Sequence, residues 1–122
     1  MHRLLLAGRA VLVVEDEYMI ADDLKQALQD EGAEVIGPVP TVAQALALIE
    51  GVPKIDVAVL DANLGGERAW PIADALANRA IPFLFVTGYE AKAIPAKFHE
   101  AIRLEKPVDA AEVVRTSGGL LA

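Results

Sequence analysis

The 122-residue sequence has no cysteine, few basic residues and no long apolar run. Without cysteine, a zinc ribbon, a thiol nucleophile and a redox pair are excluded. Eleven basic residues against eighteen acidic ones give a net charge of −7, which argues against nucleic-acid binding because Lys and Arg supply most of the affinity for phosphates. The apolar runs fall short of the roughly 20 residues that span a bilayer. We therefore expect one cytoplasmic domain over residues 1–122 that contacts neither nucleic acid nor a membrane.

Three short apolar segments have the composition of buried β-strands. They are rich in β-branched or aromatic residues and are bounded by Gly, Pro or charged residues. Their apolarity is continuous rather than alternating, which indicates a parallel sheet that is covered on both faces. These predicted strands are residues 10–14, 57–60 and 83–86, and residues 33–37 and 101–104 are two further strand candidates.

The segments between these strands have the 3.6-residue periodicity of amphipathic helices. In the first, Ile20, Leu24 and Leu28 fall on one face. Thr41 is the predicted N-cap of the second helix, and Pro71 suits the first turn of the third. The alternation of strands and helices predicts a doubly wound α/β sheet with helices on both faces.

The last two predicted helices are weak. Residues 90–98 contain Pro95, which does not fit an uninterrupted helix. The final helix begins near Asp109, and Gly118-Gly119 weakens it beyond Arg115. We therefore expect residues 116–122 to fray, and we treat residues 1–8 as an N-terminal extension.

Polar residues follow the predicted strands, where doubly wound sheets place their functional sites. They are Glu15, Asp16 and Glu17 after the first strand, Asp61 after the third, Thr87 after the fourth and Lys106 after the fifth. Crowded carboxylates repel unless a cation offsets them, and a hard divalent ion such as Mg²⁺ takes oxygen ligands. A carboxylate nucleophile, a metal, a hydroxyl group and a lysine are the parts that aspartyl-phosphate chemistry needs.

Over residues 9–115 the sequence resembles the response-regulator receiver domains of bacterial two-component signalling. The resemblance is carried by Glu15-Asp16, Asp61, Thr87 and Lys106-Pro107, in that order at successive strand ends. It implies a flavodoxin-like five-stranded parallel sheet of order 2-1-3-4-5. It also predicts a cis peptide bond between Lys106 and Pro107.

The resemblance also implies a role for each site residue. Asp61 would accept a phosphoryl group from a histidine kinase or a histidine phosphotransfer protein. Mg²⁺ would be ligated by Asp16, Asp61 and the backbone carbonyl of Asn63, with Glu15 acting through a water molecule. Lys106 would pair with Asp61 and later with its phosphoryl group, to which the Thr87 hydroxyl would also turn.

The segment Phe85-Val86-Thr87-Gly88-Tyr89 is similar to the Phe-Ala-Thr-Gly signature of the FATGUY receivers. These are usually stand-alone domains associated with HWE-type histidine kinases. Tyr89 either covers the site and modulates it or packs on the next helix. Arg103 stands where ordinary receivers have a switch Tyr or Phe, and we expect it near the surface. Gly65 replaces a frequent Pro and predicts a more mobile loop.

Other interpretations remain open. The acidic run alone could begin a helix, and Asp61 alone could form an Asx-turn. The chain could be a phosphatase or phosphotransferase with an aspartyl-phosphate intermediate, a flavodoxin-like cofactor binder, or a pseudo-receiver that binds partners without phosphorylation. We expect a signalling domain that is not an enzyme. Its output would be a contact with a downstream protein, or removal of phosphoryl groups from a shared kinase.

Overall fold

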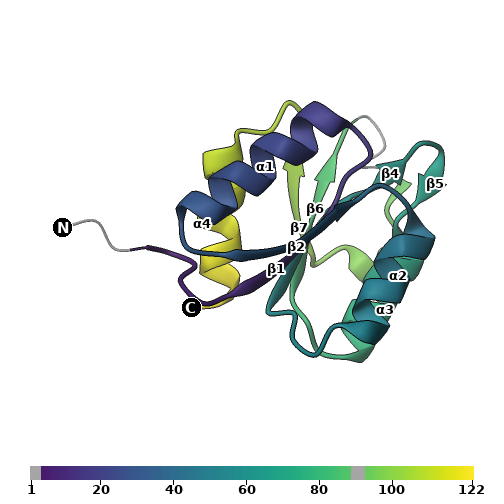
Figure 1. The fold of residues 1–122 in the computed structure, drawn as a ribbon. Coiled ribbons are helices and arrows are strands. Elements are labelled where there is room, and N and C mark those ends of the chain that lie inside the picture. Colours follow the sequence, from purple (N-terminus) through teal and green to yellow (C-terminus); the bar gives the residue numbers. More distant parts are fainter. Residues whose placement is uncertain (1–3, 89–92) are drawn as a thin grey trace.

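A parallel sheet of five strands organises the computed structural model, which describes residues 4–88 and 93–122 (Figure 1). The strands are β1 (Ala10–Val14), β2 (Glu34–Val39), β3 (Val57–Asp61), β6 (Phe83–Thr87) and β7 (Ile102–Glu105). Their order is β2-β1-β3-β6-β7, and every neighbouring pair is parallel. Since β6 and β7 are the fourth and fifth predicted strands, the predicted order 2-1-3-4-5 is confirmed.

Helices cover both faces of the sheet, as the sequence predicts. They are α1 (Tyr18–Asp30), α2 (Val42–Gly51), α3 (Trp70–Asn78) and α4 (Ala110–Leu120), with a 3-10 turn, η2 (Ala96–Phe98). Helices α1 and α4 lie on one face, and α2 and α3 on the other (Figure 1). The predicted cap of α2 is confirmed, because Thr41 Oγ1 accepts a 3.2 Å hydrogen bond from the Gln44 N–H. Within the described residues, no helix has the length and apolarity to cross a membrane.

Two apolar clusters hold these layers together. Successive side chains of a strand point to opposite faces, so Leu12 and Val14 of β1 pack with the α2 and α3 side chains. Val11 and Val13 pack instead with side chains of α1 and α4. All five residues of β1 are buried. Burial on both faces explains the continuous apolarity of this strand.

The C-terminal helix differs from its prediction. Helix α4 continues through Gly118 and Gly119 to Leu120 instead of weakening beyond Arg115. Ser117 is fully buried, and a Cβ on Gly118 would meet Leu5 at 3.8 Å. Packing of residues 117–121 against the domain accompanies this continuation despite the low helix propensity of glycine, and the fraying expected for residues 116–122 stays a prediction. The predicted N-terminal extension also packs, since Leu6 is fully buried and its N–H donates to the Glu31 carbonyl.

A small hairpin after β3 was not predicted. Strands β4 (Asn63–Leu64) and β5 (Glu67–Arg68) pair antiparallel. Gly65 and Gly66 connect them with φ values of 62° and 99°, and positive φ at both positions matches the twist of a two-residue hairpin turn. The loop expected to be mobile therefore has a regular conformation here, while its mobility stays a prediction.

Candidate functional site

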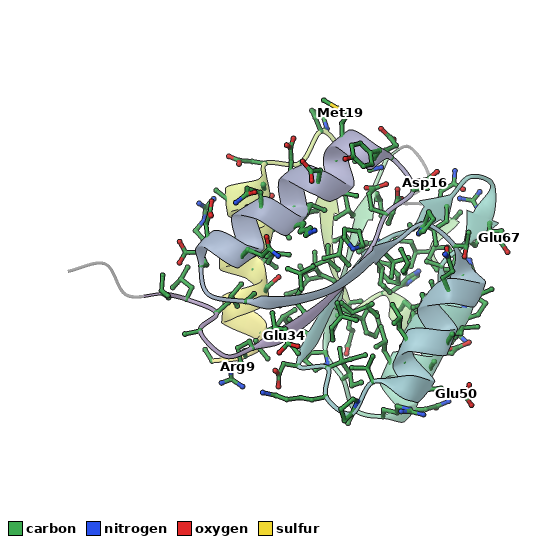
Figure 2. All side chains as sticks on the ribbon, in the orientation of Figure 1. Arg9, Asp16, Met19, Glu34, Glu50 and Glu67 are labelled. Atoms are coloured by element: carbon green, nitrogen blue, oxygen red, sulfur yellow. The ribbon has the colours of Figure 1, made fainter. Side chains whose placement is uncertain are left out.

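The carboxyl ends of β1, β3, β6 and β7 meet at one edge of the sheet. Asp61 ends β3, and Thr87 ends β6. Glu15 follows β1 directly, and Lys106 follows β7. Figure 2 shows Asp16 at this end of β1, whereas Arg9 lies at the opposite end of the strand.

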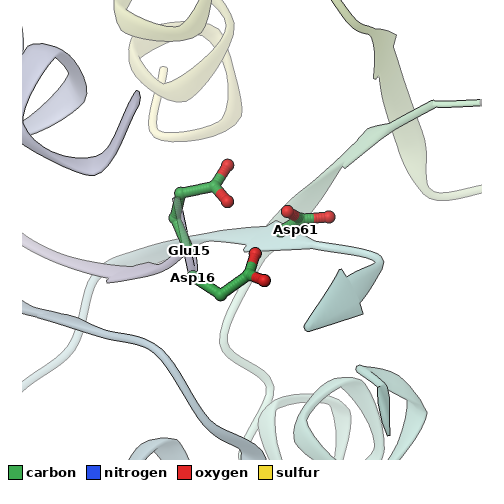
Figure 3. A group of neighbouring side chains, drawn as sticks. All are labelled: Glu15, Asp16 and Asp61. Atoms are coloured by element: carbon green, nitrogen blue, oxygen red, sulfur yellow. The ribbon is translucent and has the colours of Figure 1, made fainter. Parts of the chain in front are cut away.

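Three carboxylates converge at this edge. One oxygen each from Glu15, Asp16 and Asp61 lie within 4.8 Å of one another. Figure 3 shows the carboxylates of Glu15 and Asp16 extending toward that of Asp61. Glu15 and Asp61 are only 3% and 4% exposed, whereas Asp16 is exposed. The sequence expectation that these three acids lie together is therefore met.

Lys106 provides positive charge in the cluster. Its Nζ lies 2.8 Å from Asp61 Oδ2 and 3.4 Å from Glu15 Oε1. The Lys106–Pro107 peptide bond is cis, as predicted. Burial alone would lower the pKa of Lys106, but the hydrogen bond to Asp61 and the surrounding carboxylates raise it above its ordinary value. The ammonium group therefore stays charged.

The same surroundings disfavour the charged form of Glu15. Burial, followed by the hydrogen bond and negative charge of Asp61, raises the pKa of Glu15 from 4.5 to about 8. The Glu17 N–H, which donates to Glu15 Oε2 at 3.2 Å, and the charge of Lys106 oppose this shift only in part. One ammonium group thus does not fully compensate the buried carboxylates.

The donor set fits a hard divalent cation. Glu15 Oε1 is buried and accepts no hydrogen bond from any described residue. The converging side-chain atoms are all carboxylate oxygens, which are the ligands that Mg²⁺ takes in proteins. A bound cation would relieve the mutual repulsion of these groups.

The hairpin after β3 fixes the other side of Asp61. The Asn63 N–H donates to Asp61 Oδ1 at 3.0 Å, and the Gly66 N–H donates to Asn63 Oδ1 at 2.9 Å. Both oxygens of Asp61 are therefore engaged, one by Asn63 and one by Lys106. A Cβ on Gly65 would lie 3.7 Å from Asp16 Oδ2, so the turn lies beside the acidic cluster.

The remaining predicted residues have different environments. Thr87 is fully buried, and its hydroxyl forms no hydrogen bond with a described residue. Arg103 is exposed, as expected for a guanidinium group on the edge strand β7. Tyr89 lies outside the described residues. The weak helix predicted for residues 90–98 lies partly outside them, and its described end contains η2.

Sequence reasoning missed a role for Glu17. Its Oε1 lies 3.6 Å from Lys106 Nζ, although its side chain is 61% exposed. In the sequence, Glu17 is only the last member of an acidic run. The signal that could have identified it is its position two residues after Glu15, on the loop that faces the end of β7.

A groove lies beside Glu15 and Asp16. It has a volume of about 340 Å³ and lies between the start of α1 and the end of β2. The residues that line it are Glu15, Asp16, Tyr18, Ala21, Asp22, Lys25, Pro38 and Pro40. The acidic cluster is therefore accessible from this side.

Comparisons with known proteins agree with this geometry. Residues 11–116 match the family model described as "Response regulator receiver domain". The sensory transduction protein LytT of Bacillus cereus is 33% identical over 111 residues, which cover 87% of this chain and 44% of LytT. The chain thus spans less than half the length of the curated relatives it matches.

Solved structures extend the similarity over the whole chain. The solution structure of SdrG from Sphingomonas melonis Fr1 has a TM-score of 0.79 and 40% identity, and each chain is covered completely. The BeF3-activated conformation of SdrG from Pseudomonas melonis Fr1 has a TM-score of 0.75, again with 40% identity and complete coverage of both chains.

Proposed function

Because the chain belongs to the family of response regulator receiver domains, we propose that it accepts a phosphoryl group on Asp61 in a two-component phosphorelay. Receiver domains are signalling domains, and they interact with histidine kinases or phosphotransfer proteins. The observation that carries the proposal is the position of Asp61, which is buried beside Glu15 and Asp16 with one oxygen 2.8 Å from Lys106 Nζ.

The phosphoryl transfer would begin at a carboxylate oxygen of Asp61. That oxygen forms a new P–O bond while the P–N bond of a phosphohistidine donor breaks, and the imidazole leaves with the electron pair. Lys106 then shifts from the carboxylate to a phosphoryl oxygen, and the buried Thr87 hydroxyl donates to another. Lys106 Nζ lies 2.8 Å from Asp61 Oδ2 before transfer, and Thr87 ends the strand that pairs with β3.

A Mg²⁺ ion is the cofactor that the acidic cluster suits. Asp16, Asp61 and the backbone carbonyl of Asn63 would hold it, with Glu15 beside them. When bound, Mg²⁺ supplies positive charge against the phosphoryl oxygens. Two observations support this assignment: Glu15 Oε1 accepts no hydrogen bond from a described residue, and the converging donor atoms are all oxygens.

The signal would leave the domain by protein contact. Residues 1–122 act as one cytoplasmic receiver domain that binds a downstream protein or drains phosphoryl groups from a shared kinase, without turning over a separate substrate. The similarity to SdrG, which was solved in a BeF3-activated conformation, supports this phosphorylation chemistry. The Phe85–Tyr89 signature supports an HWE-type histidine kinase as the donor.

The test is the intact mass of the protein after incubation with acetyl phosphate and Mg²⁺. Wild type should gain one phosphoryl group, and it should gain none with a chelator present. Asp61→Asn should remain unmodified, whereas Asp74→Asn, which alters an aspartate on α3, should behave as wild type. An unmodified wild type, or equal modification of Asp61→Asn, would refute the proposal and favour a pseudo-receiver.

A further inference from the structure

Lys106 contacts a third carboxylate that the proposed phosphoryl transfer does not use. Its Nζ lies 2.8 Å from Asp61 and 3.4 Å from Glu15, both of which are buried. The third neighbour, Glu17 Oε1, lies at 3.6 Å and is open to solvent. The solvent side of the ammonium group therefore faces a negative charge.

The side chain of Glu17 does not cap the helix that follows it. Glu17 is the N-cap residue of α1, where a side-chain oxygen usually accepts a hydrogen bond from a free N–H of the first turn. Its side chain makes no such bond. Its own N–H donates to Glu15 Oε2. Glu17 is thus joined to the site through both its main chain and its side chain.

We propose that Glu17 is a positioning residue that holds Lys106 in the resting state and opposes the entry of anionic phosphodonors. This inference rests on the proposed function, because it concerns phosphoryl transfer to Asp61. An incoming phosphoryl group must draw Lys106 away from the carboxylates that surround it. Glu17 competes for the ammonium group and also repels the donor from the solvent side. It therefore slows phosphorylation by small donors.

The charge-removing variant Glu17→Gln tests this proposal. In the reaction with acetyl phosphate, an Asp61 oxygen forms a new bond to phosphorus. Acetate then leaves with the electron pair of the broken P–O bond. At low ionic strength, Glu17→Gln should be phosphorylated about threefold to tenfold faster than wild type. The difference should shrink at high salt, because the Debye length falls from about 30 Å at 0.01 M to about 3 Å at 1 M.

Beryllium fluoride binding separates positioning from a structural effect. In the presence of Mg²⁺, Glu17→Gln should bind this phosphoryl mimic about threefold to tenfold more tightly than wild type, and the difference should shrink at high salt. A purely structural effect at the start of α1 would change thermal stability and leave this affinity unchanged. The matched control is Glu105→Gln, which removes an exposed charge adjacent to Lys106 in the chain. Glu105 makes no ion pair with Lys106 in the described structure, so this variant should behave as wild type.

The outcomes distinguish this inference from the proposed function. If wild type is phosphorylated on Asp61 but Glu17→Gln is unchanged or slower, the role of Glu17 is refuted and the receiver chemistry stands. An equal acceleration in Glu105→Gln would also refute it, since any lost surface charge would then suffice. If wild type takes no phosphoryl group and binds no beryllium fluoride, both proposals fail.

Discussion

The backbone N–H of Lys106 donates a 2.7 Å hydrogen bond to the carbonyl of Thr87. This bond continues the parallel register of β6 and β7, in which Thr87 lies opposite Glu105. It ties together the two residues that we propose as donors to the phosphoryl group. A movement of either strand end therefore displaces the other donor as well.

Lys106 should stabilise the ion-free fold. Lys106→Met leaves Glu15 and Asp61 buried without a cation, and the free energy of unfolding should fall by about 3 kcal/mol. Urea denaturation in a chelator measures this loss. Arg103→Met removes an exposed cation and should change stability by less than about 0.5 kcal/mol. Equal losses in both variants would contradict the role of Lys106.

Glu15 should make the ion-free protein less stable as pH rises. Its pKa is about 8 in the folded chain against an ordinary value of 4.5, so the folded state binds the extra proton between these values. Raising the pH removes that proton, and the free energy of unfolding falls across this window.

The comparison that isolates this effect is with Glu15→Gln, which cannot titrate at this position. Below about pH 4 the two proteins should have the same pH dependence. Between about pH 5 and pH 8, wild type should lose on the order of 1 kcal/mol of stability per pH unit relative to the variant. Denaturation curves at several pH values in a chelator provide the measurement, and parallel pH profiles would contradict the prediction.

The hairpin turn should support Mg²⁺ binding. Gly66 has φ 99°, which alanine adopts only with strain, and its N–H holds the Asn63 side chain. Gly66→Ala should therefore weaken Mg²⁺ binding severalfold in titrations followed by amide resonances. Gly51→Ala is the control, because Gly51 ends α2 and a Cβ there meets nothing within 4 Å. Unchanged affinity in Gly66→Ala would exclude this role.

Phe98 should anchor η2 to the domain. Its ring packs 6.2 Å from Trp70, 6.1 Å from Phe83 and 5.9 Å from Phe85, between ring centroids. Phe98→Ala should lower the free energy of unfolding by about 3 kcal/mol and change the fluorescence of Trp70, the only tryptophan in the chain. Ile102→Ala, at a site that is 40% exposed, should cost much less. Comparable losses would show that Phe98 is not the anchor.

The repeating strands and helices could be predicted because their signals are local. Residues 10–14 form β1 with the predicted bounds, and a run of buried apolar residues suffices to identify such a strand. The convergence of Asp61 and Lys106 followed from the rule that parallel strands end at the same edge. Neither inference needed a distance between side chains.

The missed features depend on contacts between distant segments. Helix α4 continues past Gly118, where Leu5 of the N-terminal segment lies beside it, and no helix propensity contains that contact. Glu17 looks like an ordinary helix start until its side chain is seen 3.6 Å from Lys106. The hairpin around Gly65-Gly66 had a local signal, the glycine pair, but its flanking strands have only two residues each.

The burial of the Thr87 hydroxyl has a consequence for how tightly an anion is held. A solvent-exposed threonine must shed its hydration shell before it can donate to a ligand, and that dehydration cancels much of the gain. Thr87 lost its hydration when the chain folded, since it is fully buried and forms no hydrogen bond with a described residue. An oxyanion that hydrogen-bonds to this hydroxyl therefore loses less of the gain to dehydration than one that binds an exposed threonine. A variant with an apolar side chain of the same size at position 87 would be more stable than the free protein. The hydroxyl therefore favours anion binding and lowers the stability of the fold.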